Sequence, residues 1–354
     1  MSSSLASSGS DEAGLVQTFS GDVVLPTMPQ SGSHFVLIDR YPQSTMSFVD
    51  LSTAKITGQL DVSTGFAANP HDYVELDEHR ALVTRFDPNR RAGSEPNDAG
   101  GDVLLIDRRG PTIQGSIDIA QGIPNADPDL APHPDRMLTD GLRTYVVVSL
   151  YSANYQKSGG AFLVVLLNET LEIEQVTELP GVEGCSGLAL APLGEELAIA
   201  CSGNWANVRG ASTDHSAIVG VQANAPYRIN WRFSAEELPH PAAFAFTVHY
   251  LSKSEVLFVK FGRLGPTGGA IDADQLLYYD VKTQKAHVLY ETAGEAFVLG
   301  DVRCLSNCGS CAVARAGTSP GLLLFRSSGA GPRYFGTITM QDGTGLPPRW
   351  LGTF

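Results

Sequence analysis

One pattern of apolar segments recurs six times along the chain at a nearly constant interval. Each copy holds two short apolar runs, such as FVLID from Phe35 followed by TMSFVD from Thr45. The second runs begin at Thr45, Asp102, Ala161, Ala217, Gln275 and Gly321, so that successive starts are 46 to 59 residues apart. An interval of this length accommodates one four-stranded sheet with extended loops. A repeated supersecondary unit is therefore the strongest constraint on the fold.

Flanking segments complete each copy to four strands. A more polar, alternating segment follows most second runs, as in KITGQLDV from Lys55, and a strand with a tight turn precedes most first runs. The inner runs are continuously apolar, which is typical of strands covered on both faces. The 37 Gly and 21 Pro fit a chain of many short elements joined by turns. We therefore predict an all-β, six-bladed β-propeller with four-stranded antiparallel blades.

The first copy lacks a clear first strand of its own. The C-terminal LPPRWLGTF, whose Pro348-Arg349-Trp350 resembles the Pro134-Asp135-Arg136 stretch, is expected to supply it and close the ring. Residues 15–25 could instead supply this strand or add a peripheral one, which leaves seven blades as the alternative. We expect a single propeller domain over residues 15–354, after a disordered polar tether over residues 1–14.

Two segments carry a resemblance to a known family. CSGLALAPLGEELAIACSG from Cys185, and less closely HDYVELDEHRALVTRFDPN from His71, resemble the YVTN-type repeat of bacterial surface and periplasmic propellers. The resemblance covers roughly residues 34–345. It implies an exported bacterial propeller with a binding or undefined role, and it carries no catalytic residue to transfer.

Charge and hydropathy exclude two classes of partner. The net charge of −14 repels phosphate backbones, so we expect no nucleic-acid binding. No run of about 18 apolar residues is present, so no transmembrane span is expected. The Ser/Gly-rich start suits a segment that follows a processed signal or a lipid-anchor site, and we expect an exported lipoprotein or free protein of the periplasm or cell surface.

The five cysteines favour an oxidising compartment. Cys185 and Cys201 flank one predicted hairpin, and Cys304 and Cys311 flank another, so that each pair is expected to form a cross-strand disulfide and leave Cys308 over. The rival interpretation is an iron–sulfur cluster on the C-x3-C-x2-C spacing of the last three cysteines. The absence of βα alternation disfavours the protein class that uses this spacing.

Three histidines precede predicted innermost strands. His71, His133 and His240 are separated by about one and two repeat periods, so we expect them at one rim of the channel. Three imidazoles there would suit zinc, copper or iron, with Asp72 or Asp135 as a catalytic base or supporting ligand. The alternative is that each His beside a Pro hydrogen-bonds a neighbouring loop carbonyl. A calcium site is a further hypothesis, based on Asp72, Asp87, Asp98, Asp102, Asp272 and Asp274.

The long predicted loops between second and third strands indicate where a ligand would bind. They are rich in Gly, Asn and Asp, and a rigid scaffold with such loops on one face is a common binding arrangement. The leading prediction is a non-catalytic, exported propeller that binds a small molecule, a glycan or a protein there. The alternatives are a metal-dependent hydrolase or lyase, resembling the six-bladed lactonases in blade number alone, and a structural scaffold.

Overall fold

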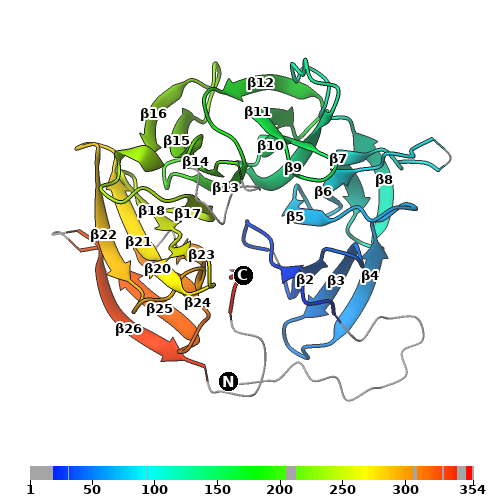
Figure 1. Cartoon of the computed structure of the whole chain (residues 1–354). Coiled ribbons are helices and arrows are strands. Elements are labelled where there is room, and N and C mark those ends of the chain that lie inside the picture. Colours follow the sequence, from blue (N-terminus) through cyan, green and yellow to red (C-terminus); the bar gives the residue numbers. More distant parts are fainter. Residues whose placement is uncertain are drawn as a thin grey trace. The chain divides into compact units, whose positions relative to one another are not determined.

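The six predicted blades are present in the computed structural model (Figure 1). It describes residues 19–30, 32–93, 95–204, 213–305, 309–328, 331–340 and 348–352. Within these residues, six four-stranded antiparallel sheets follow one another along the chain, and neighbouring strands in each sheet follow in chain order. The fold is therefore an all-β, six-bladed propeller, as the repeat predicts. The expected tether over residues 1–14 lies outside the described residues.

The blades have the following strand bounds. The first blade holds β1 (Val23–Val24), β2 (His34–Asp39), β3 (Thr45–Asp50) and β4 (Ile56–Asp61). The second holds β5 (Pro70–Glu75), β6 (Arg80–Pro88), β7 (Gly100–Asp107) and β8 (Thr112–Ile117). The third holds β9 (Leu130–Thr139), β10 (Arg143–Ser152), β11 (Ser158–Leu167) and β12 (Ile173–Leu179).

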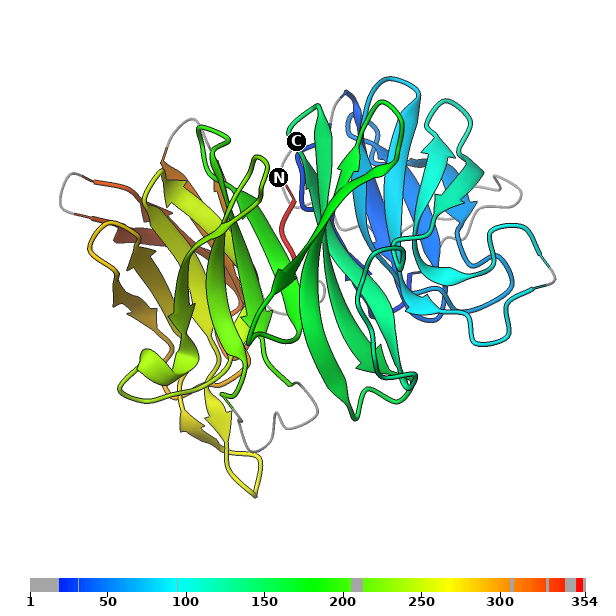
Figure 2. The same ribbon diagram turned by 90° about the horizontal axis from the view of Figure 1, so that it is seen from above.

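The second half of the chain repeats this organisation. The fourth blade holds β13 (Cys185–Leu190), β14 (Glu196–Ser202), β15 (Ser216–Gln222) and β16 (Ile229–Ser234). The fifth holds β17 (Phe244–Ser252), β18 (Glu255–Lys260), β21 (Gln275–Asp280) and β22 (Lys285–Glu291), and the sixth holds β23 (Leu299–Leu305), β24 (Ser310–Arg315), β25 (Gly321–Arg326) and β26 (Arg333–Thr339). A separate two-stranded hairpin, β19 (Arg263–Leu264) and β20 (Ala270–Asp272), lies between β18 and β21 and is drawn in yellow in Figure 2.

The chain divides into two units. The first comprises Met1–Val148, Val164–Val176 and Gly352–Phe354, and the second comprises Ser149–Leu163 and Thr177–Leu351. The first unit contains blades one and two, the second contains blades four to six, and the third blade contributes to both. No helix in the described part of the chain is long and apolar enough to span a membrane.

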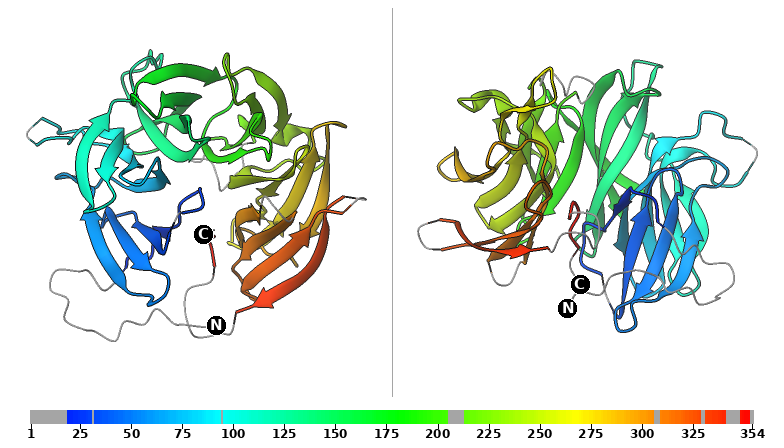
Figure 3. Two further views of the ribbon diagram at one scale, coloured as in Figure 1. Left: turned by 180° about the vertical axis from the view of Figure 1, so that it is seen from behind. Right: turned by 60° about the horizontal axis from the view of Figure 1, so that its bottom comes forward.

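Burial follows the predicted distinction between inner and outer strands. In β18 every residue after Glu255 is buried, whereas β8 alternates between exposed and half-buried positions along its whole length. Core clusters form between adjacent sheets, for example where Val259 and Leu276 of the fifth blade pack with Val302 and Val313 of the sixth. β26 is the outermost strand of the sixth blade (Figure 3). Its alternating pattern predicts polar residues at the exposed positions, but the apolar side chains of Tyr334, Phe335 and Ile338 are exposed there.

The prediction that the C-terminal strand completes the first blade is wrong. The innermost strand of that blade is β1, in which Val23 pairs with Asp39 and Val24 with Ile38. Polar contacts hold this segment, because the Asp39 carboxylate accepts the Ser20 N–H at 2.9 Å and Arg40 Nε donates to Asp22 at 3.0 Å. The alternative that residues 15–25 supply the missing strand is therefore the correct one. Apolar periodicity could not decide it, since β1 is only two residues long.

The C-terminal segment lies along the sixth blade instead. The Asp301 N–H donates to the Arg349 carbonyl at 2.8 Å, and Arg303 Nε donates to the Leu351 carbonyl at 2.9 Å. The approach to β23 is close enough to require glycine at position 300, because a Cβ there would lie 2.4 Å from the Arg349 oxygen. Leu351 N–H also donates to Asp301 Oδ2 at 3.1 Å.

Buried side chains link each described blade to the start of the next. Ser44 Oγ accepts the Ala68 N–H at 3.0 Å just before β5, and Thr84 Oγ1 donates to the Asp135 carbonyl of β9 at 2.7 Å. The equivalent links are Ser149 to Cys185, Ser216 to Phe244 and Asp274 to Leu299. Each link satisfies a backbone group that would otherwise be buried without a partner.

Both predicted disulfides are confirmed. Cys185 is bonded to Cys201 and Cys304 to Cys311, and each pair lies directly opposite across two antiparallel strands. Cys308 lies outside the described residues. The bridges close loops of 16 and 7 residues. In the chain-entropy model they contribute about 3 and about 2 kcal/mol to stability.

Removing the longer bridge is expected to destabilise the fold. The double variant Cys185→Ser/Cys201→Ser should lower the free energy of unfolding by about 3 kcal/mol, because the denatured chain gains loop entropy. Urea denaturation of the unreduced protein measures this value. Thiol counting in denaturant should give one free thiol before reduction and five after in the wild type, and one before and three after in the double variant. Five free thiols before reduction in protein from an oxidising host would contradict both bridges.

Candidate functional site

In each unit, the loops between second and third strands lie beside the segments that lead into innermost strands. In the first unit, Thr64 Oγ1 donates to the Asn97 carbonyl of the β6–β7 loop at 3.0 Å. In the second unit, the Asp274 carboxylate accepts the N–H groups of Gly262 at 2.6 Å and Phe297 at 2.8 Å. Within each unit, these loops therefore lie next to each other, as the sequence predicts, and we call them the loop face of that unit.

Arg85 fixes the base of the β6–β7 loop. Its side chain is fully buried, Nε and Nη2 bond both oxygens of Asp102 at 2.8 and 2.6 Å, and Nη1 donates to the Val62 carbonyl and to Thr64 Oγ1. A further Nη2 bond reaches the Asn97 carbonyl at 2.6 Å. Five bonds match the five N–H donors of a guanidinium, so the side chain has no remaining hydrogen-bonding capacity. The loop is thereby held to both β7 and the β4–β5 connection.

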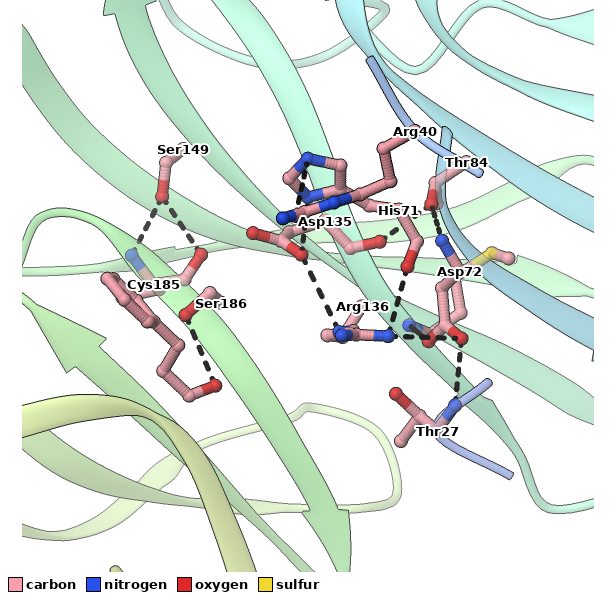
Figure 4. Close-up of polar contacts among 12 residues, drawn as sticks. Thr27, Arg40, His71, Asp72, Thr84, Asp135, Arg136, Ser149, Cys185 and Ser186 are labelled. Carbon is pink, nitrogen blue, oxygen red and sulfur yellow. Dashed lines mark hydrogen bonds and ion pairs between the residues drawn. The ribbon is translucent and has the colours of Figure 1, made fainter. Parts of the chain in front are cut away.

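His71 and Asp135, both predicted site residues, form a buried pair in the first unit (Figure 4). His71 Nδ1 lies 2.9 Å from Asp135 Oδ1, and His71 Nε2 lies 3.4 Å from Arg40 Nη1. A guanidinium can only donate, so Nε2 accepts and Nδ1 carries the proton that is donated to Asp135. Burial lowers the pKa of the His71 imidazole below its ordinary value, against the opposing effect of Asp135. His71 is therefore neutral, and both ring nitrogens are engaged.

Asp72 serves the backbone. Its carboxylate is fully buried and accepts the N–H groups of Thr27 at 2.8 Å, Tyr73 at 2.9 Å and Met137 at 2.8 Å (Figure 4). These donors come from the N-terminal segment, from β5 itself and from β9. Arg136 Nη1 lies 3.7 Å from the same carboxylate and donates to the His71 carbonyl at 3.0 Å. Asp72 thus joins three segments, which leaves it poorly placed to act as a base.

His133 bonds a loop carbonyl, which is the alternative to metal binding that the sequence offers for the histidines. Its Nδ1 lies 2.8 Å from the Ala131 carbonyl oxygen, so the ring donates to its own loop. Both His71 and His133 contact the Phe86 ring, with centroid distances of 4.1 and 4.9 Å. Burial lowers the pKa of the His133 imidazole to about 4. The proline beside it fixes the backbone, and the imidazole completes the local hydrogen bonding.

In the second unit, serine hydroxyl groups beside β13 bond the backbone, and ion pairs near the innermost strands include His215–Glu183 at 3.8 Å and Arg303–Asp301 at 3.0 Å. Ser149 Oγ accepts the Cys185 N–H at 2.9 Å, and Ser186 Oγ donates to the Phe246 carbonyl at 3.4 Å (Figure 4). His240 is exposed and lies before β17, and its carbonyl accepts a bond from Lys260 Nζ at 3.3 Å. Burial lowers the pKa of the Lys260 ammonium below its ordinary value.

No metal site is assembled in the described residues. They include no group of three or more His, Cys, Asp or Glu side chains that could hold a metal ion. Several aspartates proposed for calcium already bind protein donors. Asp98 accepts the Gly93 N–H, Asp102 binds Arg85, Asp272 binds Arg263, and Asp274 accepts four backbone N–H groups. The metal sites on His71, His133 and His240 and on the aspartates remain predictions.

Sequence reasoning missed the arginines that organise this region. Arg40, Arg85 and Arg136 bond to residues 12 to 111 positions away, and neither spacing nor periodicity marks such partners. One signal was present, because an arginine at the buried end of an apolar strand, as in ALVTR at Arg85, must find an acidic partner.

Comparison with known proteins supports the fold alone. No protein-family model matches the chain, and no curated protein matches it. Among solved structures, it is similar to the β-propeller domain of Cps50 (Swd1) from Myceliophteria thermophila, with 11% identity, 84% of this chain and 81% of that chain covered, and a TM-score of 0.54. KlAtg21 in complex with the coiled coil of AgAtg16 matches with 12% identity, coverages of 89% and 84%, and a TM-score of 0.55.

A third neighbour has a name that suggests an enzyme. It is a proposed 6-phosphogluconolactonase from Bacteroides fragilis, with 9% identity, 91% of this chain and 83% of that chain covered, and a TM-score of 0.53. At these identities the likenesses establish a β-propeller and nothing finer. The YVTN-type repeat is not confirmed by a family model.

Replacing Asp72 is expected to destabilise the first unit. In Asp72→Asn an amide NH₂ takes the place of one carboxylate oxygen, so that one of the three backbone donors faces another donor. The free energy of unfolding should fall by about 3 kcal/mol in denaturant titrations. The control is Asp61→Asn, which changes an exposed carboxylate whose single hydrogen bond among the described residues is from the Ser63 N–H at 2.8 Å. Equal stability of the two variants would show that Asp72 does not join the segments.

His133 is expected to make stability depend on pH below neutrality. The imidazole titrates near 6.5 when unfolded and at about 4 when folded. Between these values the unfolded chain binds a proton that the folded chain does not. The contribution is thus complete above pH 6.5 and is lost as the pH falls toward 4. The decrease in the free energy of unfolding between pH 7.5 and 4.5 should be about 2 kcal/mol smaller in His133→Gln. An identical decrease in His133→Gln and the wild type would refute this assignment, and His79→Gln, at an exposed turn, is the control.

Proposed function

We propose that this protein is an exported, non-catalytic β-propeller that binds a small molecule, a glycan or a protein with its loop face. The observation that carries the proposal is the construction of the β6–β7 loop. Arg85 holds the base of the loop, and Asp98 Oδ2 accepts the Gly93 N–H at 2.9 Å inside it. Beyond this base the loop carries two exposed arginines, Arg90 and Arg91.

A loop held in one conformation favours recognition. Ordering a mobile loop costs free energy when a ligand binds, and a loop that is already ordered avoids most of that cost. Arg90 and Arg91 stand out because the chain as a whole carries a net charge of −14. An exposed pair of guanidinium groups on a rigid support suits a ligand with an anionic group, such as an acidic glycan or an acidic protein segment.

The proposal of a non-catalytic role is supported by the hydrogen bonds that the candidate acid and base residues make within the protein. His71 has both ring nitrogens engaged, and Asp72 and Asp135 bind protein donors. A catalytic base must reach the proton that it removes, and these groups would first have to break internal bonds. The alternative is a hydrolase or lyase with a divalent metal at His71, His133 and His240, and the lactonase-like name of one structural neighbour is consistent with it. A protein-binding role is consistent with the neighbour that is complexed with a coiled coil.

Export is supported by the cysteine chemistry. Two disulfides account for four of the five cysteines, and such bridges persist in secreted and periplasmic proteins. A lipid anchor near the N-terminus, as the Ser/Gly-rich start suggests, would place the propeller at the cell surface or in the periplasm. The proposal is therefore a soluble binding domain held outside the cytoplasm.

The binding proposal predicts a ligand whose affinity depends on the tip of the β6–β7 loop. The purified full chain is screened on a glycan array and on an acidic-peptide array. We expect the affinity for the ligand found to fall about tenfold in Arg90→Ser/Arg91→Ser, because each lost charge-assisted hydrogen bond weakens binding substantially. The matched control is Lys282→Ser/Lys285→Ser, which removes two exposed charges from the β21–β22 turn and the first residue of β22 and should leave the affinity unchanged.

Two results would count against this function. One is a ligand whose affinity does not change in the arginine variant. The other is stoichiometric divalent metal in protein purified without chelator, together with lactone hydrolysis that is lost in both His71→Ala and His133→Ala, which would establish the hydrolase alternative.

A further inference from the structure

A cavity lies between the first and second blades, within the first unit. Its volume is about 350 Å³, and its walls include Val36, Phe48 and Gly58 of the first blade and Tyr73, Glu75 and Arg108 of the second. Pockets for small organic ligands begin at about 300 Å³. β6 runs from the β5–β6 turn at this cavity to the β6–β7 loop at its other end, so the cavity is separate from the loop face.

The cavity has a fixed apolar floor. Phe48 and Tyr73 meet edge to face with centroids 6.2 Å apart, and Tyr73 is almost fully buried. Gly58 lies opposite Phe48 in the β3–β4 pairing, and a Cβ at Gly58 would meet only Pro111, at 3.9 Å. The Gly58 backbone has no positive φ, so its conformation does not require glycine. The missing side chain therefore leaves space that other residues do not fill.

One wall of the cavity is charged but already neutralised. Arg108 Nη2 lies 2.6 Å from Glu75 Oε1, and a second Arg108 nitrogen donates to the Asp77 carbonyl. This ion pair is partly buried, which holds the guanidinium in place. It leaves little net charge to attract a ligand, so the charge selectivity of the cavity must come from its rim.

The rim carries Glu78, Arg109 and His34, and His34 Nε2 lies 4.0 Å from Asp50 Oδ2. Glu78, in the β5–β6 turn, is exposed and has no hydrogen bond or ion pair within the part of the chain that the structure describes. Arg109, in the β7–β8 turn, has a side chain that is 65% exposed and bonds Asp107 at 3.2 and 3.4 Å. This pair is weak because solvent screens it, and it leaves three of the five N–H donors of Arg109 for a ligand. Both turns belong to the second blade, so the opposite charges stand on one rigid support.

We propose that this cavity binds a free amino acid with an apolar side chain. The side chain would contact Phe48 and Val36, the ammonium group would pair with Glu78, and the carboxylate would pair with Arg109. A zwitterion suits a rim with one charge of each sign, whereas a ligand with a single charge would leave one partner unused. The proposal is independent of the ligand of the loop face.

Four probes that share one aromatic ring test the charge requirement by calorimetry on the full chain. L-Phenylalanine carries both an ammonium and a carboxylate group, 2-phenylethylamine carries only the ammonium, and 3-phenylpropionate carries only the carboxylate. N-acetyl-L-phenylalaninamide carries no charge. We expect L-phenylalanine to bind about tenfold more tightly than either singly charged probe, and its affinity should exceed that of the neutral probe by a larger factor. No binding of L-phenylalanine at millimolar concentration, or equal binding of the neutral probe, would overturn the proposal.

Variants assign the contacts. Gly58→Leu should fill the cavity and abolish binding, and the matched control is Gly115→Leu, because Gly115 lies opposite Leu105 in the β7–β8 pairing and has no atom within 4 Å of its Cβ position. Glu78→Gln should lower the affinity for 2-phenylethylamine about tenfold and leave the affinity for 3-phenylpropionate unchanged. Arg109→Gln should lower the affinity for 3-phenylpropionate about tenfold and leave the affinity for 2-phenylethylamine unchanged. Both rim residues are exposed, so these variants should fold even if Gly58→Leu does not. Loss of both probes in both rim variants, or of neither, would refute the assigned roles.

Discussion

Consecutive blades of this protein are joined by buried polar side chains that bond the backbone in or just before the innermost strand of the next blade. Ser44, Thr84, Ser149, Ser216 and Asp274 make these links, one at each described junction between consecutive blades. A backbone N–H or carbonyl buried without a partner costs about 1–3 kcal/mol. A chain that leaves one sheet and enters the next inside the fold must satisfy several such groups, and short hydroxyl and carboxylate side chains do so without occupying much volume.

The same requirement explains the residues that resemble a catalytic site in the sequence. His, Asp and Pro cluster before the innermost strands because those segments need fixed geometry and many hydrogen-bond partners. In the first unit, Asp72 accepts three backbone N–H groups and His71 lies between Asp135 and Arg40. These contacts already engage the His71 ring nitrogens and the Asp72 carboxylate, which is the observation behind the proposed non-catalytic function. The two proposed binding regions lie elsewhere, at the tip of the β6–β7 loop and at the rim of the cavity between the first two blades.

The two proposed binding regions differ in how the chain builds them. The β6–β7 loop projects from the end of β6 and is held at its base by the fully bonded Arg85. The cavity results from a missing side chain at Gly58 where two sheets face each other. One region offers exposed guanidinium groups to a large partner, and the other encloses a volume suited to a small ligand. A propeller can carry both, because its loops and turns lie at opposite ends of the strands.

The sequence alone determined the fold class, the number of blades, most strands and both disulfides. Those features depend on local patterns: the repeat interval, the contrast between continuous and alternating apolar runs, and cysteines placed across short hairpins. Only the tertiary structure decided that β1 rather than the C-terminal segment completes the first blade, that Arg40 and Arg136 contact His71, and where the cavity lies. Each of these depends on side chains from distant segments that meet in space. Periodicity reports which face of a strand is buried, and it does not report which distant partner covers that face.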